Sequence, residues 1–162
     1  IKLITQNILT SINLNLTMVH DYAIDGKTLV MATKGTIASE RFLYLYHAYD
    51  NGKTTILACP GLADLIEQGR NDLLLAYFDE HFSAFKDVDN IVLGCTHYPL
   101  IKKELKDFFG DVKFFDSALG VSKELKRKVE LKKILPTKRR IEFYDSSCDQ
   151  LKEERFYKFL QK

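Results

Sequence analysis

Short apolar runs alternate along the chain with longer stretches in which apolar residues recur every three or four positions. Short unbroken runs are typical of strands buried on both faces, and the longer spacing is typical of amphipathic helices. The pattern predicts strands over residues 28–33, 54–59, 90–95, 112–116 and 140–145. It predicts helices over residues 38–49, 62–85 with a break near Gly69, 99–109, 121–135 and 148–160.

The regular alternation of strands and helices indicates the fold class. Strands that are joined through helices form parallel βαβ units with right-handed crossovers. We therefore predict an α/β fold in which helices flank a parallel sheet. Apolar residues at positions 1, 4, 8 and 12 also predict a leading helix within residues 1–19. Because a domain rarely opens on such a helix without a starting methionine, we expect a fragment, a processed chain or a missing upstream half.

Composition restricts the class of protein. The chain has 162 residues, of which 46% are hydrophobic and 28% charged, enough for one domain with a buried core. It contains no apolar run of membrane-spanning length and no signal-peptide pattern, so we expect no membrane partner. Its three cysteines, Cys59, Cys95 and Cys148, lack the spacing of a disulfide framework. This cysteine usage indicates a cytoplasmic protein.

Charge gives little support for nucleic-acid binding. The net charge is only +2, although residues 123–140 hold nine basic residues against two acids. Such a segment can form a nucleic-acid patch. However, Val121, Leu125, Val129 and Leu131 run through it, which favours the solvent-exposed face of a helix, and no aromatic residue is interleaved for base stacking. We therefore predict no nucleic-acid partner.

The sequence IVLGCTHYPLI at residues 91–101 carries the most informative chemistry. A predicted strand ends at Cys95, His97 follows, and Pro99 opens a helix. Ligands of parallel α/β sheets bind outside the carboxyl ends of the strands. A thiol there can be a nucleophile, a metal ligand or a base, or simply a buried cysteine followed by a capping threonine. The spacing does not guarantee contact between Cys95 and His97, and too few ligands accompany them for zinc, so we predict no metal site.

Polar residues also follow two other predicted strands. Thr33 and Thr36 bring two hydroxyls to the start of a helix, where backbone N–H groups can hold a carboxylate or phosphate. The alternative is that Thr36 or Ser39 only caps that helix. Cys59 ends the next strand, and Glu67 follows on a helix from which a carboxylate can orient an imidazole or bind an ammonium group. Taken alone, Glu67 is equally consistent with an ordinary exposed acid.

Together, these strand ends resemble the second half of the bacterial glutamate racemase family. Three segments carry the resemblance in order and spacing: ATKGTI at 32–37, ACPGLADLIEQG at 58–69 and LGCTHYPLI at 93–101. It continues weakly through FFDSALG at 114–120 and FYDSSCD at 143–149. The resemblance therefore covers nearly all of the chain after Lys27.

The resemblance implies a cofactor-independent racemase that supplies D-glutamate for peptidoglycan. In this family two cysteines act on opposite faces of glutamate, and Cys95 matches the cysteine that acts on the L-enantiomer. His97 and Glu67 match the pair that assists it. Thr33, Thr36 and Thr96 match residues that hold the carboxylate and amino groups of the substrate. The partner implied is glutamate itself, and the family leaves a homodimer open.

The chain also departs from the family pattern. The glycine-rich Asp-Ser opening and the Cys-Asn-Thr strand end of the first half do not occur in it, Ala118 replaces a usual glycine, and Cys148 stands where glycine is usual. We therefore expect residues 1–117 to form the second of two pseudosymmetric lobes, and residues 118–162 to complete the first. Lacking the first catalytic cysteine, this chain is expected to be inactive alone.

Two other functions remain open at this stage. The chain could be a noncatalytic binding module, a racemase-derived lobe that has lost its partner lobe. It could also belong to a relative that acts on aspartate or hydantoins. Thr33, Thr36 and the His97 that follows Cys95 favour glutamate.

Overall fold

Four strands form one parallel sheet in the computed structural model, which describes residues 25–50, 52–118, 120–123, 142–144, 146 and 150–160. The strands are β1 (Thr28–Ala32), β2 (Thr54–Ala58), β3 (Asn90–Leu93) and β4 (Lys113–Phe115). Their order across the sheet is β2-β1-β3-β4, and every neighbouring pair is parallel. This arrangement confirms the predicted α/β class. No helix in the described part of the chain is both long and apolar enough to cross a membrane.

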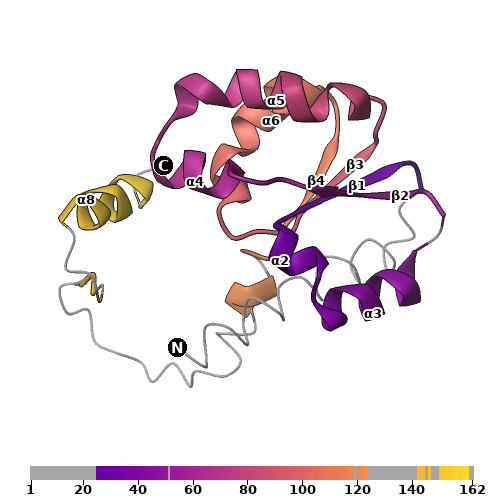
Figure 1. Cartoon of the computed structure of the whole chain (residues 1–162), viewed down its shortest axis with the longest axis horizontal. Helices are drawn as coiled ribbons and strands as arrows, with labels where there is room; N and C mark the ends of the chain where they lie inside the picture. Colours follow the sequence, from indigo (N-terminus) through magenta and orange to yellow (C-terminus); the bar gives the residue numbers. More distant parts are fainter. Residues whose placement is uncertain are drawn as a thin grey trace.

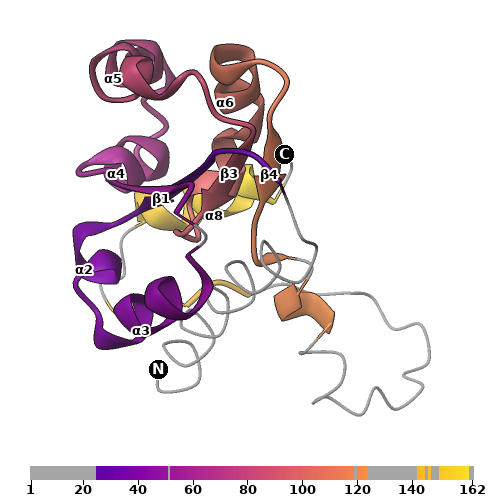
Figure 2. The ribbon, with the colours of Figure 1, turned by 90° about the vertical axis from the view of Figure 1, so that its right-hand side faces the viewer.

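Helices cover both faces of the sheet (Figures 1 and 2). On one face lie α4 (Leu62–Glu67), α5 (Leu74–Phe82) and α6 (Lys102–Phe109); on the other lie α2 (Lys34–Ile37) and α3 (Glu40–Tyr49). Three short 3₁₀ helices connect these elements: η1 (Asn71–Leu73), η2 (Ser83–Phe85) and η3 (Tyr98–Ile101). The last helix, α8 (Gln150–Phe159), lies beyond the sheet on the side toward which the strands point.

The two faces of the sheet bury cores of different size. Leu29, Met31, Ile91 and Leu93 point to one face, where α4, α5 and α6 add a large aromatic cluster that includes Phe78 and Phe82. The intervening residues Val30 and Val92 point to the other face, where Phe42 and Leu45 of α3 cover them. Since side chains alternate along a strand, burial on both faces explains why β1 and β3 are unbroken apolar runs.

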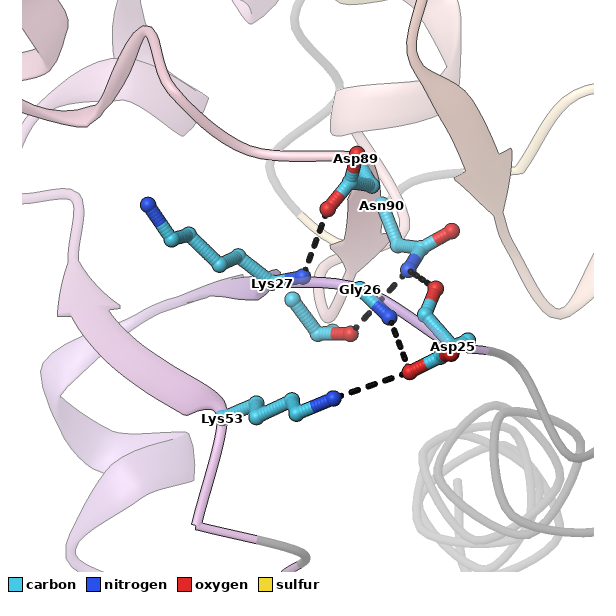
Figure 3. Close-up of polar contacts among 7 residues, drawn as sticks. Asp25, Gly26, Lys27, Lys53, Asp89 and Asn90 are labelled. Carbon is cyan, nitrogen blue, oxygen red and sulfur yellow. Dashed lines mark hydrogen bonds and ion pairs between the residues drawn. The ribbon is translucent and has the colours of Figure 1, made fainter.

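At the amino edge of the sheet, Asp89 joins the starts of three strands (Figure 3). Its carboxylate accepts a hydrogen bond of 2.7 Å from the N–H of Lys27, just before β1. Its own N–H donates to the Lys27 carbonyl at 2.9 Å, and the N–H of Lys113 in β4 donates to the Asp89 carbonyl at 2.9 Å. Gly26 has φ 104°, and a Cβ there would lie 2.3 Å from Asp89 Oδ2, so this approach requires glycine.

Asn90 and Asp25 extend this amino-edge network (Figure 3). The Asn90 side-chain amide donates to the carbonyl of Asp25 at 3.2 Å and to the hydroxyl of Thr28 at 3.4 Å. The Asp25 carboxylate accepts from Lys53, which precedes β2, at 2.9 Å. The starts of the strands are therefore connected to one another by side chains as well as by the sheet.

The described elements confirm most of the predicted ones. The first four strands form, each one or two residues shorter than predicted, and Gly69, with φ 69°, lies in the break between α4 and α5. Helix α6 and the predicted helix over 148–160 also form, the latter as α8. The pattern does not predict α2, because a four-residue helix containing glycine has too little apolar periodicity.

Three predictions fall wholly or partly outside the described residues. The leading helix over 1–19 lies outside them, as do Cys148 and most of the basic segment 123–140. Residues 120–123 are helical, in agreement with the start of the predicted helix over 121–135. The strand predicted over 140–145 is wrong at its described residues, 142–144, which form no strand. Because strand formation by a short apolar run depends on the neighbours against which it packs, local pattern alone does not decide whether such a run joins a sheet.

Candidate active site

Gly94 places the turn that follows β3 directly against β1. Its N–H donates to the Met31 carbonyl at 2.8 Å. A Cβ at this position would lie 2.8 Å from that same carbonyl oxygen and 3.1 Å from the Cβ of Ala32. Only glycine therefore allows the two strand ends to lie this close, and Cys95 follows immediately at the carboxyl edge of the sheet.

Cys95 and His97 meet because the chain turns after Leu93. On an extended chain, residues two apart are about 7 Å from each other. Here the N–H of Tyr98 donates to the Cys95 carbonyl at 3.3 Å and closes a turn. The Cys95 Sγ consequently lies 3.8 Å from His97 Nδ1, within hydrogen-bonding range for sulfur. The contact that the spacing alone did not guarantee is present.

Glu67 approaches the same imidazole from a different element. It is the last residue of α4, and its Oε2 lies 3.8 Å from His97 Nε2. This distance is too long for a direct hydrogen bond but short enough for electrostatic attraction. The His97 and Glu67 side chains are 35% and 47% exposed. Thiol, imidazole and carboxylate thus form a line at the carboxyl edge, open to solvent at one end.

This arrangement favours a thiolate on Cys95. Burial by itself raises the pKa of the thiol, but hydrogen bonds from the side chain and backbone of His97 lower it by more. The positive charge of His97 and the Thr96 hydroxyl add to the lowering, so the pKa of Cys95 lies below its ordinary value.

The same arrangement favours an imidazolium on His97. The hydrogen bond with Cys95 raises the pKa of His97 most, and burial opposes this. The negative charges of Cys95, Glu67 and Asp64 raise it further, so the pKa of His97 lies above its ordinary value. Both shifts therefore favour the form of the pair in which Cys95 is a thiolate and His97 an imidazolium.

Cys59 directly follows β2, which is separated from β3 by β1, and has the opposite character. Its side chain is only 2% exposed and belongs to the larger core. Burial raises the pKa of the Cys59 thiol to about 12. Cys59 is therefore a neutral, buried thiol at neutral pH, whereas Cys95, at the same edge of the sheet, is partly exposed and has a lowered pKa.

Thr33 and Thr36 form a second polar group at this edge, beyond the end of β1. Their hydroxyl oxygens are 2.9 Å apart, and Thr33 caps α2 by accepting from the Thr36 N–H at 3.2 Å. Ser39, rather than Thr36, caps α3. Both threonines are half-buried, and Thr96 is exposed. Since β1 and β3 are neighbours, the two threonine hydroxyls and the Cys95 turn share one edge of the sheet.

Three residues that contribute to this geometry receive no role from the sequence motifs. Gly94 allows the close approach of β1, Tyr98 closes the turn, and Asp64 adds negative charge near His97. Asp64 could have been found from its spacing, because it lies three residues before Glu67 and thus on the same face of α4. Among the described residues, no group of three or more His, Cys, Asp or Glu is placed to hold a metal ion.

Comparison of the sequence with known proteins points to one enzyme family, although no family model matches the chain. The glutamate racemase of Clostridium botulinum (strain Okra / Type B1) is 38% identical over 122 residues, which are 72% of this chain and 48% of that protein. The glutamate racemase of Clostridium novyi (strain NT) is 41% identical over 110 residues, 64% of this chain and 42% of that protein. The chain thus spans about half the length of the curated relatives it matches.

Solved structures agree with the sequence matches. The glutamate racemase of Campylobacter jejuni superposes with a TM-score of 0.70 at 28% identity, over 92% of this chain and 62% of that one. The Francisella tularensis enzyme, solved in complex with D-glutamate, gives a TM-score of 0.65 at 26% identity, over 93% of this chain and 59% of that one. The chain is therefore homologous to the glutamate racemases, over about half of their length.

Proposed function

We propose that this chain carries one half of the active site of a glutamate racemase, with Cys95 as the acid–base group for one face of the substrate. The observation that carries this proposal is the line formed by Cys95, His97 and Glu67 at the carboxyl edge of the sheet. It supplies a partly exposed thiol whose pKa is lowered beside His97 and an imidazole whose pKa is raised beside Cys95. The homology to glutamate racemases supports glutamate as the substrate.

The proposed reaction needs no redox step and no cofactor. The Cys95 thiolate takes the α-proton of L-glutamate, so that the Cα–H bond breaks and an S–H bond forms. The electron pair left on Cα is delocalised into the adjacent carboxylate. Because an α-proton is weakly acidic, this step requires a positioned base and hydrogen bonds that stabilise the developing negative charge.

The remaining site residues have supporting roles in this proposal. Glu67 orients His97 and favours its charged form, which in turn favours the Cys95 thiolate. Thr33, Thr36 and Thr96 bind the carboxylate and amino groups of the substrate, since a hydroxyl can both donate and accept a hydrogen bond. The position of the Thr33–Thr36 pair just beyond the end of β1, the strand that neighbours β3, is consistent with this role.

The second face of the substrate requires a second acid. Cys59 does not suit this role, because it is buried and its thiol has a pKa of about 12. We therefore infer that the second base belongs to another lobe, that residues 1–117 form the lobe with Cys95, and that residues 118–162 complete the other. In the cell, the product D-glutamate would enter peptidoglycan synthesis in the cytoplasm.

The test is conversion of L-glutamate to D-glutamate in deuterated water by the protein that contains this chain, followed by chiral chromatography and mass spectrometry. We expect D-glutamate with deuterium at Cα, and its loss in Cys95→Ala. Cys59→Ala, which also removes one thiol, serves as the matched control and should retain conversion. Near-parental turnover by Cys95→Ala would remove Cys95 from its role.

A second measurement tests the lobe assignment. One base cannot exchange protons on both faces of Cα, so the 162-residue chain alone should form no D-glutamate. Formation of D-glutamate by the isolated chain would contradict the need for another lobe.

A further inference from the structure

Two buried tyrosines hold the corner that follows β2. The Tyr98 hydroxyl donates to the carbonyl of Cys59 at 3.5 Å, and the Tyr77 hydroxyl donates to the carbonyl of Pro60 at 3.0 Å. Tyr98 is fully buried and Tyr77 is 9% exposed. Cys59 is buried, whereas Pro60 is exposed. A buried carbonyl such as that of Cys59 requires a donor, because leaving it without a hydrogen bond is unfavourable.

This corner determines where α4 begins. Gly61 follows with φ 74°, and α4 then runs from Leu62 to Glu67. Leu62 and Ile66 are buried in the larger core, so the short helix is fixed to the corner at one end and to the core along its side. The position of the Glu67 carboxylate beside His97 therefore depends on the position of the corner.

Tyr98 links this corner to the reactive turn. It directly follows His97, and its backbone N–H closes the turn by donating to the Cys95 carbonyl. Its ring then extends into the core, where its hydroxyl meets the end of β2. A single residue thus connects the element that carries the thiol and imidazole to the element that leads to the carboxylate.

We propose that Tyr98 is a positioning residue for the racemase site, whose hydroxyl fixes the β2 corner relative to the Cys95 turn and so keeps Glu67 beside His97. This inference rests on the proposed function. Without the hydroxyl, the Cys59 carbonyl has no donor, the corner shifts, and Glu67 moves away from His97. The imidazolium is then less stabilised, and a smaller fraction of Cys95 is thiolate at neutral pH.

The test compares Tyr98→Phe with Tyr46→Phe in the full protein. Tyr46 is the matched control, since it is a half-buried tyrosine on α3, across the sheet, whose hydroxyl interacts with Asp50. The rate of Cys95 alkylation by iodoacetamide is measured against pH by peptide mass spectrometry, and thermal unfolding is recorded in parallel. We expect Tyr98→Phe to slow alkylation at neutral pH by no more than loss of the Glu67 charge does, about twofold to fivefold, and Tyr46→Phe to match the parent.

Two further variants keep the result interpretable. Tyr77→Phe removes the donor to the Pro60 carbonyl and should shift the pH profile of Cys95 alkylation in the same direction by a smaller amount. If Tyr98→Phe does not fold, Tyr77→Phe is the variant that tests the inference. In a Glu67→Gln background, Tyr98→Phe should have no additional effect. A lower unfolding temperature with an unchanged alkylation profile would assign Tyr98 a purely structural role and overturn the inference. If the unmutated protein instead showed the Cys95 alkylation profile of an ordinary thiol, the proposed function itself would be overturned.

Discussion

The two edges of the sheet use polar residues in different ways. At the amino edge, Asp89 accepts a backbone N–H at 2.7 Å and Asp25 accepts from Lys53 at 2.9 Å, so charged groups are engaged with one another or with the backbone (Figure 3). At the carboxyl edge, Cys95, His97 and Glu67 approach to 3.8 Å and remain partly exposed. The polar groups of the amino edge form short hydrogen bonds that hold the strands together. The polar groups of the carboxyl edge are farther apart and partly exposed, so they can still bind a substrate.

A count of charged side chains would have placed the functional site at the amino edge instead of the carboxyl edge. The amino edge has more ionised side chains, but its ion pairs are largely exposed, as in Lys53 with Asp25. Exposed pairs of this kind contribute little to stability and are screened by salt. The carboxyl edge has fewer charges, but the contact between Cys95 and His97 moves the pKa values of both groups away from their ordinary values, against the effect of burial.

The largest effect is expected from removing the imidazole at the carboxyl edge. His97→Asn should lower racemization about 10²–10⁴-fold, the usual contribution of a group that assists proton transfer. The pH profile of the parent should be bell-shaped. Its rising limb lies below the ordinary thiol pKa of about 8.5, because the pKa of Cys95 is lowered, and its falling limb lies above the ordinary imidazole pKa of about 6.5, because that of His97 is raised. Unchanged turnover in His97→Asn would contradict the assigned role.

Gly94→Ala should disturb stability and reactivity together. The added Cβ would meet the Met31 carbonyl oxygen at 2.8 Å, so β1 and the Cys95 turn must move apart. We expect a loss of about 1–3 kcal/mol in the free energy of unfolding, typical of overpacking, measured by urea denaturation. Alkylation of Cys95 should slow in the folded variant. Gly35→Ala is the control, since its Cβ would meet no atom within 4 Å.

Asp89→Ala should weaken the amino edge without changing the reactivity of Cys95 at the carboxyl edge. Loss of its charged acceptor for the Lys27 N–H should lower the free energy of unfolding by about 1–3 kcal/mol, while the pH profile of Cys95 alkylation stays unchanged. Asp87→Ala is the control, because Asp87 pairs with Lys27 only at the surface and should leave the denaturation midpoint in place. A shifted Cys95 profile in Asp89→Ala would show that the edges are coupled.

The smallest effect is expected from Glu67→Gln, which keeps the shape of the side chain and removes its charge. Because Glu67 raises the pKa of His97 across 3.8 Å of partly exposed space, alkylation of Cys95 at neutral pH should slow about twofold to fivefold. High salt should reduce the same difference. Glu40→Gln, on α3 at the opposite face, should have no effect; an equal effect would point to net charge instead of contact.

The sequence predicts individual residues at this site better than the contacts between them. The apolar runs around Val30 and Val92 predict the central strands, and strand order then brings Thr33 and Cys95 to one edge. Glu67 and His97, in contrast, are separated by a helix and a strand, so their meeting depends on how α4 packs. Local pattern does not encode this packing, because Leu62 and Ile66 would fit any amphipathic helix.

The amino-edge network is also beyond sequence pattern. Asp25, Lys53 and Asp89 look like ordinary surface charges, and only the crossover connections bring them together. The contact between Asp25 and Asn90 joins residues 65 positions apart. Gly26 offers the only local signal, since a glycine directly before a strand indicates a close backbone approach.

The bond between Lys27 and Asp89 spans 62 residues, and this has a consequence for how the protein folds. β1 lies between β2 and β3, so its second edge stays unpaired until the whole segment from Lys27 to Asp89 has closed into a loop. Closing such a loop loses chain entropy before any distant contact compensates for it, which slows folding. The Cys95 turn, which Gly94 holds against β1, therefore reaches its final place only after this loop has closed, and the change in Cys95 reactivity during refolding would time the pairing of β1 with β3.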